Sequence, residues 1–203
     1  MESEMSAGRR AQSTQENRAR MVTAARKAFA ANGYVAASMD DLTADAGLSR
    51  GALYHGFGGK AGLLAVVVEQ IDSEMAARAQ QAGAAQPDRW NALLAEAAAY
   101  IEMALEPEIR RIVLLDGPAI LGDPSLWPSQ NACLALTRSA VADLIADGTM
   151  QRVDVEAAAR LLNGAALNAA LWLASSEDPQ RQLPDAIAAF RIMASGFLQD
   201  SRR

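Results

Sequence analysis

Residues 38–60 read SMDDLTADAGLSRGALYHGFGGK, a pattern of two short helices joined by a tight turn. Ser38 can cap the first helix, which Gly47 can end, and Ser49 can cap a second helix that begins at Arg50. A glycine-containing turn of about three residues between two short helices is typical of the helix-turn-helix, whose second helix enters the major groove of DNA. The sequence therefore predicts a DNA-binding element close to the N-terminal end.

The charge distribution is compatible with such an element. Residues 1–60 contain eight Lys or Arg and six Asp or Glu, a net charge of +2, whereas the rest of the chain carries −7 and the whole chain −5. The basic balance therefore lies with the helix-turn-helix, and the acidic bulk would be held away from the phosphates. The positive charge of residues 1–60 is modest, so it is compatible with DNA binding but does not establish it.

Apolar residues recur at helical spacing along the rest of the chain. Because no stretch shows sustained alternation of apolar and polar residues, we expect no sheet and an all-α fold. The helix over residues 15–32 should have a basic solvent side, formed by Arg18, Arg20, Arg26 and Lys27. Further helices are expected over residues 59–81, 88–105, 107 to about 117, 129–147, 154–175 and 183–199.

Two joints interrupt this helical pattern. Residues 82–87, AGAAQP, have the composition of a small-residue linker. Gly62 lies in the first turn of the helix over residues 59–81, where a glycine costs helix stability. We interpret it as a soft hinge between two domains.

Composition and motifs exclude several classes of protein. No apolar run approaches the roughly 18 residues of a membrane span, and the N-terminus lacks the apolar segment of a signal peptide, so we expect a cytoplasmic protein without a membrane partner. A single cysteine, Cys133, excludes an intrachain disulfide framework and cysteine-rich metal sites. HExxH, GxSxG and Walker motifs are absent, and the one histidine, His55, lies on the predicted recognition helix. We expect neither an enzyme nor a cofactor or metal site.

The segment LSRGALYHGFGGKAGLL, with ANGY and SMDDLTADAG before it, resembles the DNA-binding domain of the TetR family of transcriptional repressors. The resemblance covers roughly residues 15–68. It departs from the family at Gly56, where a side chain that helps to hold the DNA backbone is usual. It implies that the second helix of the motif faces DNA and that Lys60 contacts a phosphate. The residues expected to bind DNA are Ser38, Ser49, Arg50, Gly51, Ala52, Tyr54, His55 and Lys60.

These residues are expected to divide into two roles. Phosphate contacts position a DNA-binding domain, and contacts with base edges provide its specificity. The positioning group would be Ser38, Tyr54 and Lys60. The group that meets base edges would be Arg50, Ala52 and His55.

The last two predicted helices resemble the dimerisation pair of the same family, which forms a four-helix bundle with its copy. The helix over residues 155–175 is also rich in Ala and Leu over most of its circumference, more apolar surface than one neighbour could cover. A homodimer would place two recognition helices on successive turns of a palindromic operator. Burial of this helix wholly within its own domain is the alternative. The expected interface residues are Leu162, Ala165, Ala166, Ala169, Phe190, Ala194 and Phe197.

By the same resemblance, residues 88–175 enclose a pocket for a small-molecule effector, whose binding moves the helix that starts near Lys60. For each apolar candidate in this region, ordinary core packing is the alternative. Asn168 lies four residues before Trp172, so both share one helix face. The candidate lining residues are Met103, Leu115, Trp127, Cys133, Asn163, Asn168 and Trp172.

The sequence thus predicts three parts: a disordered N-terminal arm over residues 1–16, a three-helix DNA-binding domain over 17–62, and a helical effector-binding and dimerisation domain over 63–203. The expected function is that of a homodimeric repressor, released from double-stranded DNA by an unidentified small molecule. Two alternatives stay open: a DNA-binding dimer that ignores ligands, and a helical module for protein interactions.

Overall fold

The computed structural model describes the backbone of residues 2–199 and the side chains of residues 12–199. Within that range the regular elements are helices, and an isolated antiparallel bridge joins Met150 to Leu198. The helices are α1 (Glu2–Ala36), α2 (Met39–Asp45), α3 (Arg50–Phe57), α4 (Lys60–Ala84), α5 (Arg89–Glu102), α6 (Pro107–Ile109), α7 (Gly117–Leu121), α8 (Pro128–Ala146), α9 (Val155–Ser175) and α10 (Pro179–Ser195). The predicted all-α class is confirmed.

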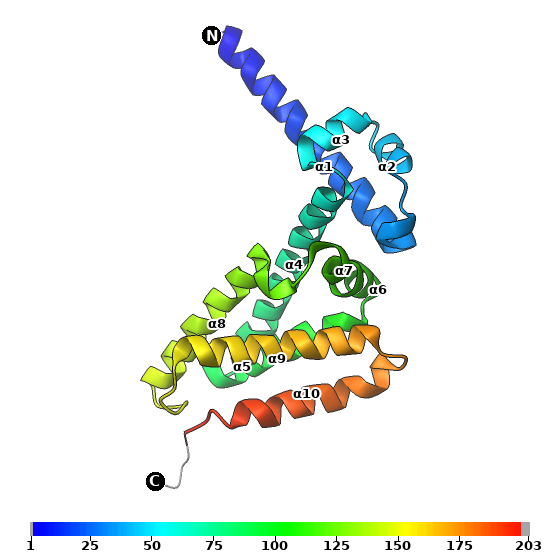
Figure 1. Cartoon of the computed structure of the whole chain (residues 1–203). Coiled ribbons are helices and arrows are strands. Elements are labelled where there is room, and N and C mark those ends of the chain that lie inside the picture. The colour runs from blue at the N-terminus through cyan, green and yellow to red at the C-terminus, as the bar shows by residue number, and fades with distance from the viewer. Residues whose placement is uncertain (1, 200–203) are drawn as a thin grey trace.

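The molecule is elongated, with α1, α2 and α3 at one end and α9 and α10 at the other (Figure 1). Helix α4 connects the two ends: it packs against α1 and α3 near its start and against α5 and α8 further along. Helices α9 and α10 lie next to each other across the far end, where the described chain finishes. The fold therefore separates the helix-turn-helix from the last two helices by the length of α4.

The predicted helix caps are present. The Ser38 hydroxyl accepts hydrogen bonds from the amides of Asp40 and Asp41 at the start of α2. The Ser49 hydroxyl accepts one from the Ala52 amide, 3.2 Å away, at the start of α3. At the start of α9, Asp154 accepts from the amide of Ala157 at 2.8 Å. Each cap satisfies an amide that has no partner within its own helix.

The helix-turn-helix shares one core with α1 and α4. Phe29 of α1, Leu42 of α2, Leu53 of α3 and Leu63 and Leu64 of α4 have no exposed surface. The three helices before α4 therefore cannot separate from its first turns without exposing large apolar side chains.

Several boundaries differ from those expected. Residues 2–16 continue α1 as a helix in place of the expected disordered arm, and residue 1 lies outside the described residues. Nine of these fifteen residues are Glu, Ala, Arg or Gln, which favour a helix. The break in α1 falls at Gly33, whose φ of 75° takes it out of helical geometry.

Helix α4 reaches Ala84, which shortens the expected linker. The turn expected at Gly117-Pro118 is also wrong, because helical backbone continues to Leu121 through a π-helical segment, Arg110–Asp116. Proline is tolerated there because the first amides of a helical turn need no intrahelical partner. Helix α10 begins at Pro179 and ends at Ser195, each four residues earlier than expected.

Gly62 is not a soft joint. A Cβ atom at this position would overlap the carbonyl oxygen of Phe57, the last residue of α3. The glycine therefore lets the start of α4 approach the end of α3 closely, and the contact fixes the two helices relative to each other.

Candidate nucleic-acid interface and cavity

Helix α3 is fixed from behind by α1. The guanidinium of Arg18 donates a hydrogen bond of 2.9 Å to the carbonyl oxygen of Gly56 and lies 4.6 Å from the ring centre of Phe57. Arg18 is exposed, as expected, and it reaches the carbonyl of Gly56 and the ring of Phe57 along the surface. The side of α3 that faces α1 is therefore not available to DNA.

The opposite side of α3 is open. Arg50, Gly51, Ala52, Tyr54 and His55 are all exposed, and Tyr54 keeps 59% of its surface accessible. Tyr54 therefore presents both its ring and its hydroxyl to solvent on this side of α3. The structure thus groups the residues predicted to meet DNA on one accessible face.

Arg50 already has a partner within the motif. Its Nε and Nη2 atoms each lie 2.5 Å from a carboxylate oxygen of Asp40 on α2. Hydrogen bonds from this guanidinium hold the pKa of Asp40 below its usual range. Both side chains are exposed, so the pair can open to let Arg50 contact another acceptor.

Lys60, the predicted phosphate contact, lies at the junction of α1 and α4. Its Nζ atom is 4.5 Å from the ring centre of Tyr34 and donates to the carbonyl oxygen of Val35 at 3.4 Å. Loss of solvent around the ammonium lowers its pKa. The amide of Tyr34 in turn donates to Asp116 at 2.7 Å, which ties this junction to the helical body.

A second link between the DNA-facing end and the body was missed. Arg26 on α1 donates to Glu74 of α4 at 2.7 Å and to Glu108 of α6 at 2.8 Å. Arg26 was assigned to the solvent side of α1, and this was wrong because the two acidic partners lie 48 and 82 residues further along the chain. No local pattern marks such a contact.

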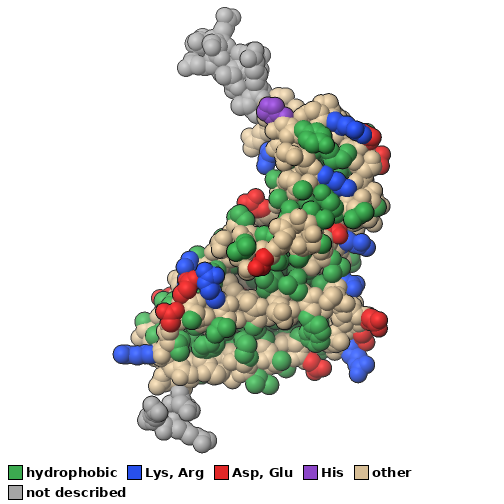
Figure 2. Space-filling view, in the orientation of Figure 1, with side chains coloured by type: hydrophobic (Ala, Val, Ile, Leu, Met, Phe, Trp, Pro, Cys, Tyr) green, Lys and Arg blue, Asp and Glu red, His purple; other side chains and the backbone are tan. Residues whose placement is uncertain are grey.

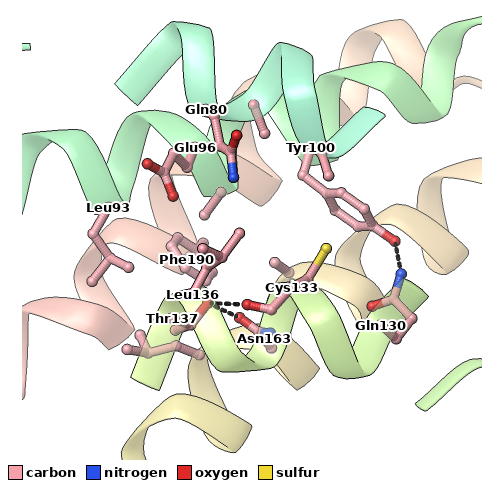
Figure 3. A pocket seen from close by; sticks show the side chains of 15 residues that line it. Gln80, Leu93, Glu96, Tyr100, Gln130, Cys133, Leu136, Thr137, Asn163 and Phe190 are labelled. Atoms are coloured by element: carbon pink, nitrogen blue, oxygen red, sulfur yellow. Dashed lines mark hydrogen bonds between the residues drawn. The ribbon is translucent and has the colours of Figure 1, made fainter. Parts of the chain in front are cut away.

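A cavity of about 90 Å³ lies between α4, α5, α8, α9 and α10. Figure 3 shows Glu96 and the Tyr100–Gln130 pair at opposite ends of it. Its apolar wall includes Ala76 and Ala79 of α4, Leu93 of α5 and Phe190 of α10. Its polar lining consists of Gln80, Glu96, Tyr100, Gln130, Cys133, Thr137 and Asn163.

Only two of the seven predicted lining residues, Cys133 and Asn163, border the cavity. Met103 and Trp127 are buried in the core, with exposed fractions of 3% and 8%. Leu115 and Asn168 do not border the cavity, and Trp172 is 47% exposed. The error at Trp172 is geometric, because nine residues of helix separate it from Asn163 and place the two side chains on opposite faces.

A buried hydrogen-bond network lies behind one wall of the cavity. Asp72 of α4 is 2% exposed and accepts hydrogen bonds from Ser129 at 2.6 Å and Gln130 at 3.1 Å. Gln130 also donates to the hydroxyl of Tyr100. Burial raises the pKa of Asp72, and its Oδ1 atom has no hydrogen-bond partner. The network joins α4 to α5 and α8.

Asp72 was also missed in the sequence, although a signal exists. It follows Leu64 and Val68 at intervals of four residues, so it belongs to the buried stripe of α4. A carboxylate on a buried stripe requires hydrogen-bond donors from a neighbouring helix.

The predicted dimer interface needs correction. Leu162, Ala166, Phe190 and Ala194 pack inside their own chain, with exposed fractions of 7% or less. Assigning them to a dimer interface was wrong, because the inner faces of α9 and α10 bury them against the other helices of the body. Ala165, Ala169 and Phe197 are half-buried.

The outer faces of α9 and α10 carry Leu161, Trp172, Ile192 and Met193, all at least 43% exposed. Hydrophobic side chains are visible along this end of the molecule in Figure 2.

Within residues 2–199, no single helix has both the length and the apolar character needed to cross a membrane. Helices α3 and α4 together satisfy that test by length and composition alone, but they are bent by 61° at their junction.

The helix-turn-helix of α2 and α3 and the all-helical body behind it have the architecture of a helix-turn-helix regulator of transcription. Residues 22–67 match the family of bacterial regulatory proteins described as the tetR family, and residues 90–197 match the tetracyclin repressor-like, C-terminal domain. The chain belongs to the TetR family of transcriptional regulators. Regulators of this family act through DNA and are generally not enzymes.

The solved structures agree with this assignment. A TetR-family transcriptional regulator from Pectobacterium atrosepticum is 45% identical, with a TM-score of 0.84 over 92% of this chain and 96% of its own. RolR bound to resorcinol is 19% identical, with a TM-score of 0.69 over 94% and 98% of the two chains. FadR from Bacillus subtilis in complex with stearoyl-CoA is 15% identical, with a TM-score of 0.64 over 84% and 96%. These two similarities concern the fold. Among curated proteins, no sequence matches this chain.

Proposed function

We propose that the protein is a homodimeric repressor that a small molecule releases from a palindromic operator. The observation that carries this proposal is the course of α4. Its first turn packs against α3, and about 24 Å further along, at a rise of about 1.5 Å per residue, Ala76, Ala79 and Gln80 form part of the cavity wall. A ligand that moves this wall would therefore move the recognition helix.

The DNA contact is assigned to the exposed face of α3. Arg50, Ala52 and His55 would meet base edges, while Ser38, Tyr54 and Lys60 would position the domain on phosphates, with Ser49 and Gly51 at the start of the helix beside them. The homodimer is assigned to the outer faces of α9 and α10, where large apolar side chains are exposed. A two-fold axis there would present two copies of α3 to one duplex.

The cavity favours a ligand-responsive regulator over a DNA-binding dimer that ignores ligands. It combines an apolar wall with a few polar groups, which is the usual composition of a small-molecule site. The family assignment disfavours the third possibility, a module for protein interactions alone.

The test begins with selection of genomic fragments by the purified protein, followed by sequencing to define an operator. Fluorescence anisotropy then compares the operator with a version that carries base substitutions. Arg50→Ala should reduce the preference for the operator about tenfold, whereas Lys60→Ala should weaken binding to both duplexes alike. Arg152→Ala, an exposed arginine far from α3 in the chain, is the charge-matched control and should change neither. Equal loss of preference in the Arg50 and Lys60 variants would contradict the assigned roles.

A further inference from the structure

The cavity contains one carboxylate without a partner. Glu96 of α5 is half-buried and makes no hydrogen bond or ion pair with the described residues. Two other acidic side chains of the helical body are paired: Glu106 with Arg78, and Asp143 with Arg89. A partly buried charge without a partner is costly, so Glu96 is a candidate ligand contact.

The fold makes a specific place for this side chain. A Cβ atom at Gly83 of α4 would lie 2.7 Å from Cγ of Glu96 and still closer to its carboxylate. A side chain at position 83 would therefore force Glu96 out of the position that it occupies against α4. Gly83 itself is buried, so the glycine is not explained by an exposed turn.

The charges around the cavity have one sign. Among its lining residues there is no Lys, Arg or His. Asp72 lies directly behind Gln130 and Tyr100. Burial raises the pKa of the Cys133 thiol, which borders the cavity, and the negative charges of Asp72 and Glu96 raise it further. The field inside the cavity thus opposes an anion and attracts a cation.

The remaining lining fits a small apolar body. Leu93, Ala97 and Phe190 supply hydrocarbon surface, and the Phe190 ring can also attract a cation through its face. A volume of about 90 Å³ leaves room for a small organic group.

We propose that the effector of this regulator is a small organic cation, a protonated amine on an apolar or aromatic body, whose ammonium group pairs with Glu96. The inference rests on the proposed function, because it assigns a chemistry to the ligand of the same cavity. Gln80, which also borders the cavity, offers a carbonyl oxygen as a further acceptor for the ammonium group.

The experiment compares three probes of matched shape by isothermal titration calorimetry on the full chain at pH 7: 2-phenylethylamine, 2-phenylethanol and 3-phenylpropionate. The amine should bind at least tenfold more tightly than the alcohol, and the carboxylate should bind most weakly. E96Q should remove the preference for the amine and leave the affinity for the alcohol within twofold. E102Q changes an exposed glutamate on the same helix and should behave as the wild type.

A second variant keeps the negative charge of Glu96 and removes the space beside Gly83 that its side chain occupies. G83A should displace the Glu96 side chain and lower the affinity for the amine, again with little effect on the alcohol. Equal binding of amine and alcohol, an amine preference that survives E96Q, or no binding of any of the three probes would overturn the proposal.

The same protein is then titrated with operator DNA in the presence of the amine. Loss of the amine preference with normal operator binding overturns only the ligand chemistry. A clear amine preference in a protein that binds no operator supports the ligand chemistry and contradicts the proposed function. Release of the operator by the amine, and not by the alcohol at equal concentration, supports both.

Discussion

The guanidinium of Arg50 and the carboxylate of Asp40 form a two-pronged ion pair across the turn of the helix-turn-helix, with two nitrogen–oxygen distances of 2.5 Å. The donors that would read a base edge are thus occupied by an acid of the same motif. DNA must compete with Asp40 for Arg50, and the negative charge of Asp40 stands beside the approaching phosphates.

Asp40→Asn should therefore tighten binding to the operator by about tenfold at low salt, more than to the base-substituted duplex, because it frees Arg50 for a base edge. Removal of a negative charge beside the phosphates should also steepen the salt dependence by about one unit of slope. Anisotropy titrations between 50 and 200 mM salt would measure both effects. Asp45→Asn removes an exposed acid of the same helix and serves as the control. An equal gain in the two variants would show that net charge alone, and not the pair with Arg50, is responsible.

Gly62→Ala should destabilise the protein, because the added Cβ overlaps the carbonyl oxygen of Phe57. We expect a loss of about 1–3 kcal/mol in the free energy of unfolding, the usual cost of forcing an atom into a packed contact. Urea denaturation measures it. Gly56→Ala is the matched control, because no atom lies within 4 Å of its added Cβ and alanine favours the helix. A stable Gly62→Ala protein would restore the interpretation of Gly62 as a soft hinge.

The sequence predicted those features that local pattern determines. The caps at Ser38 and Ser49 and the exposed residues of α3 follow from residue types at fixed spacing. The cavity lining was mostly wrong, because helical spacing shows which residues share a face and not which face turns inward. Trp172 was grouped with Asn168 on one face of the helix, whereas the inner face of α9 is the one that carries Asn163.

Long-range pairs also escaped prediction. Arg26 and Glu108 meet only because α1, α4 and α6 fold together, and nothing near either residue indicates its partner. Gly83 and Glu96 are a similar case, since the role of the glycine appears only when α5 lies against α4.

Arg26→Met should loosen α1 from the helical body. It leaves Glu74 and Glu108 without their partner, and we expect a loss of about 1–3 kcal/mol at pH 7, since the arginine side chain is only 23% exposed. Arg160→Met removes an exposed pair within one helix and should cost much less. Similar losses in the two variants would show that Arg26 does not hold the helices together.

The same arginine gives stability a pH dependence. Hydrogen bonds from Arg26 lower the pKa of Glu74 in the folded protein. A carboxylate with a lowered pKa stabilises the fold above its unfolded pKa, about 4.3, and this contribution is lost as the pH falls through the folded value. Between about pH 5 and 3 the wild type should lose stability more steeply than Arg26→Met. Parallel curves of melting temperature against pH would contradict the link.

Asp72 should give the stability of the protein a pH dependence opposite in sign to that from Glu74, and Asp72→Asn tests this. Burial raises the pKa of Asp72, so its ionisation opposes folding increasingly as the pH rises above the unfolded value of about 3.9. Relative to wild type, the asparagine variant should therefore gain melting temperature, by a few degrees, between pH 4 and pH 7. Asp143→Asn, an exposed acid of α8, should show no such gain. A difference that stays constant with pH would mean that folding does not shift the pKa of Asp72.

Ile192→Asp should convert the proposed dimer to monomers. Ile192 is 74% exposed on the outer face of α10, where Leu161, Trp172 and Met193 are also exposed, and such a group of large apolar side chains is typical of an interface. A charge in the centre of such an interface costs several kcal/mol, enough to raise the dissociation constant of the dimer at least a hundredfold. Leu126→Asp is the matched control, because Leu126 is also 74% exposed but lies in the segment before α8. Analytical ultracentrifugation should find monomers for the first variant and the wild-type species for the second, with unchanged circular dichroism in both. Monomers from Leu126→Asp alone would contradict an interface on α9 and α10 and would place it near the segment before α8. The two recognition helices would then need a different spacing on DNA.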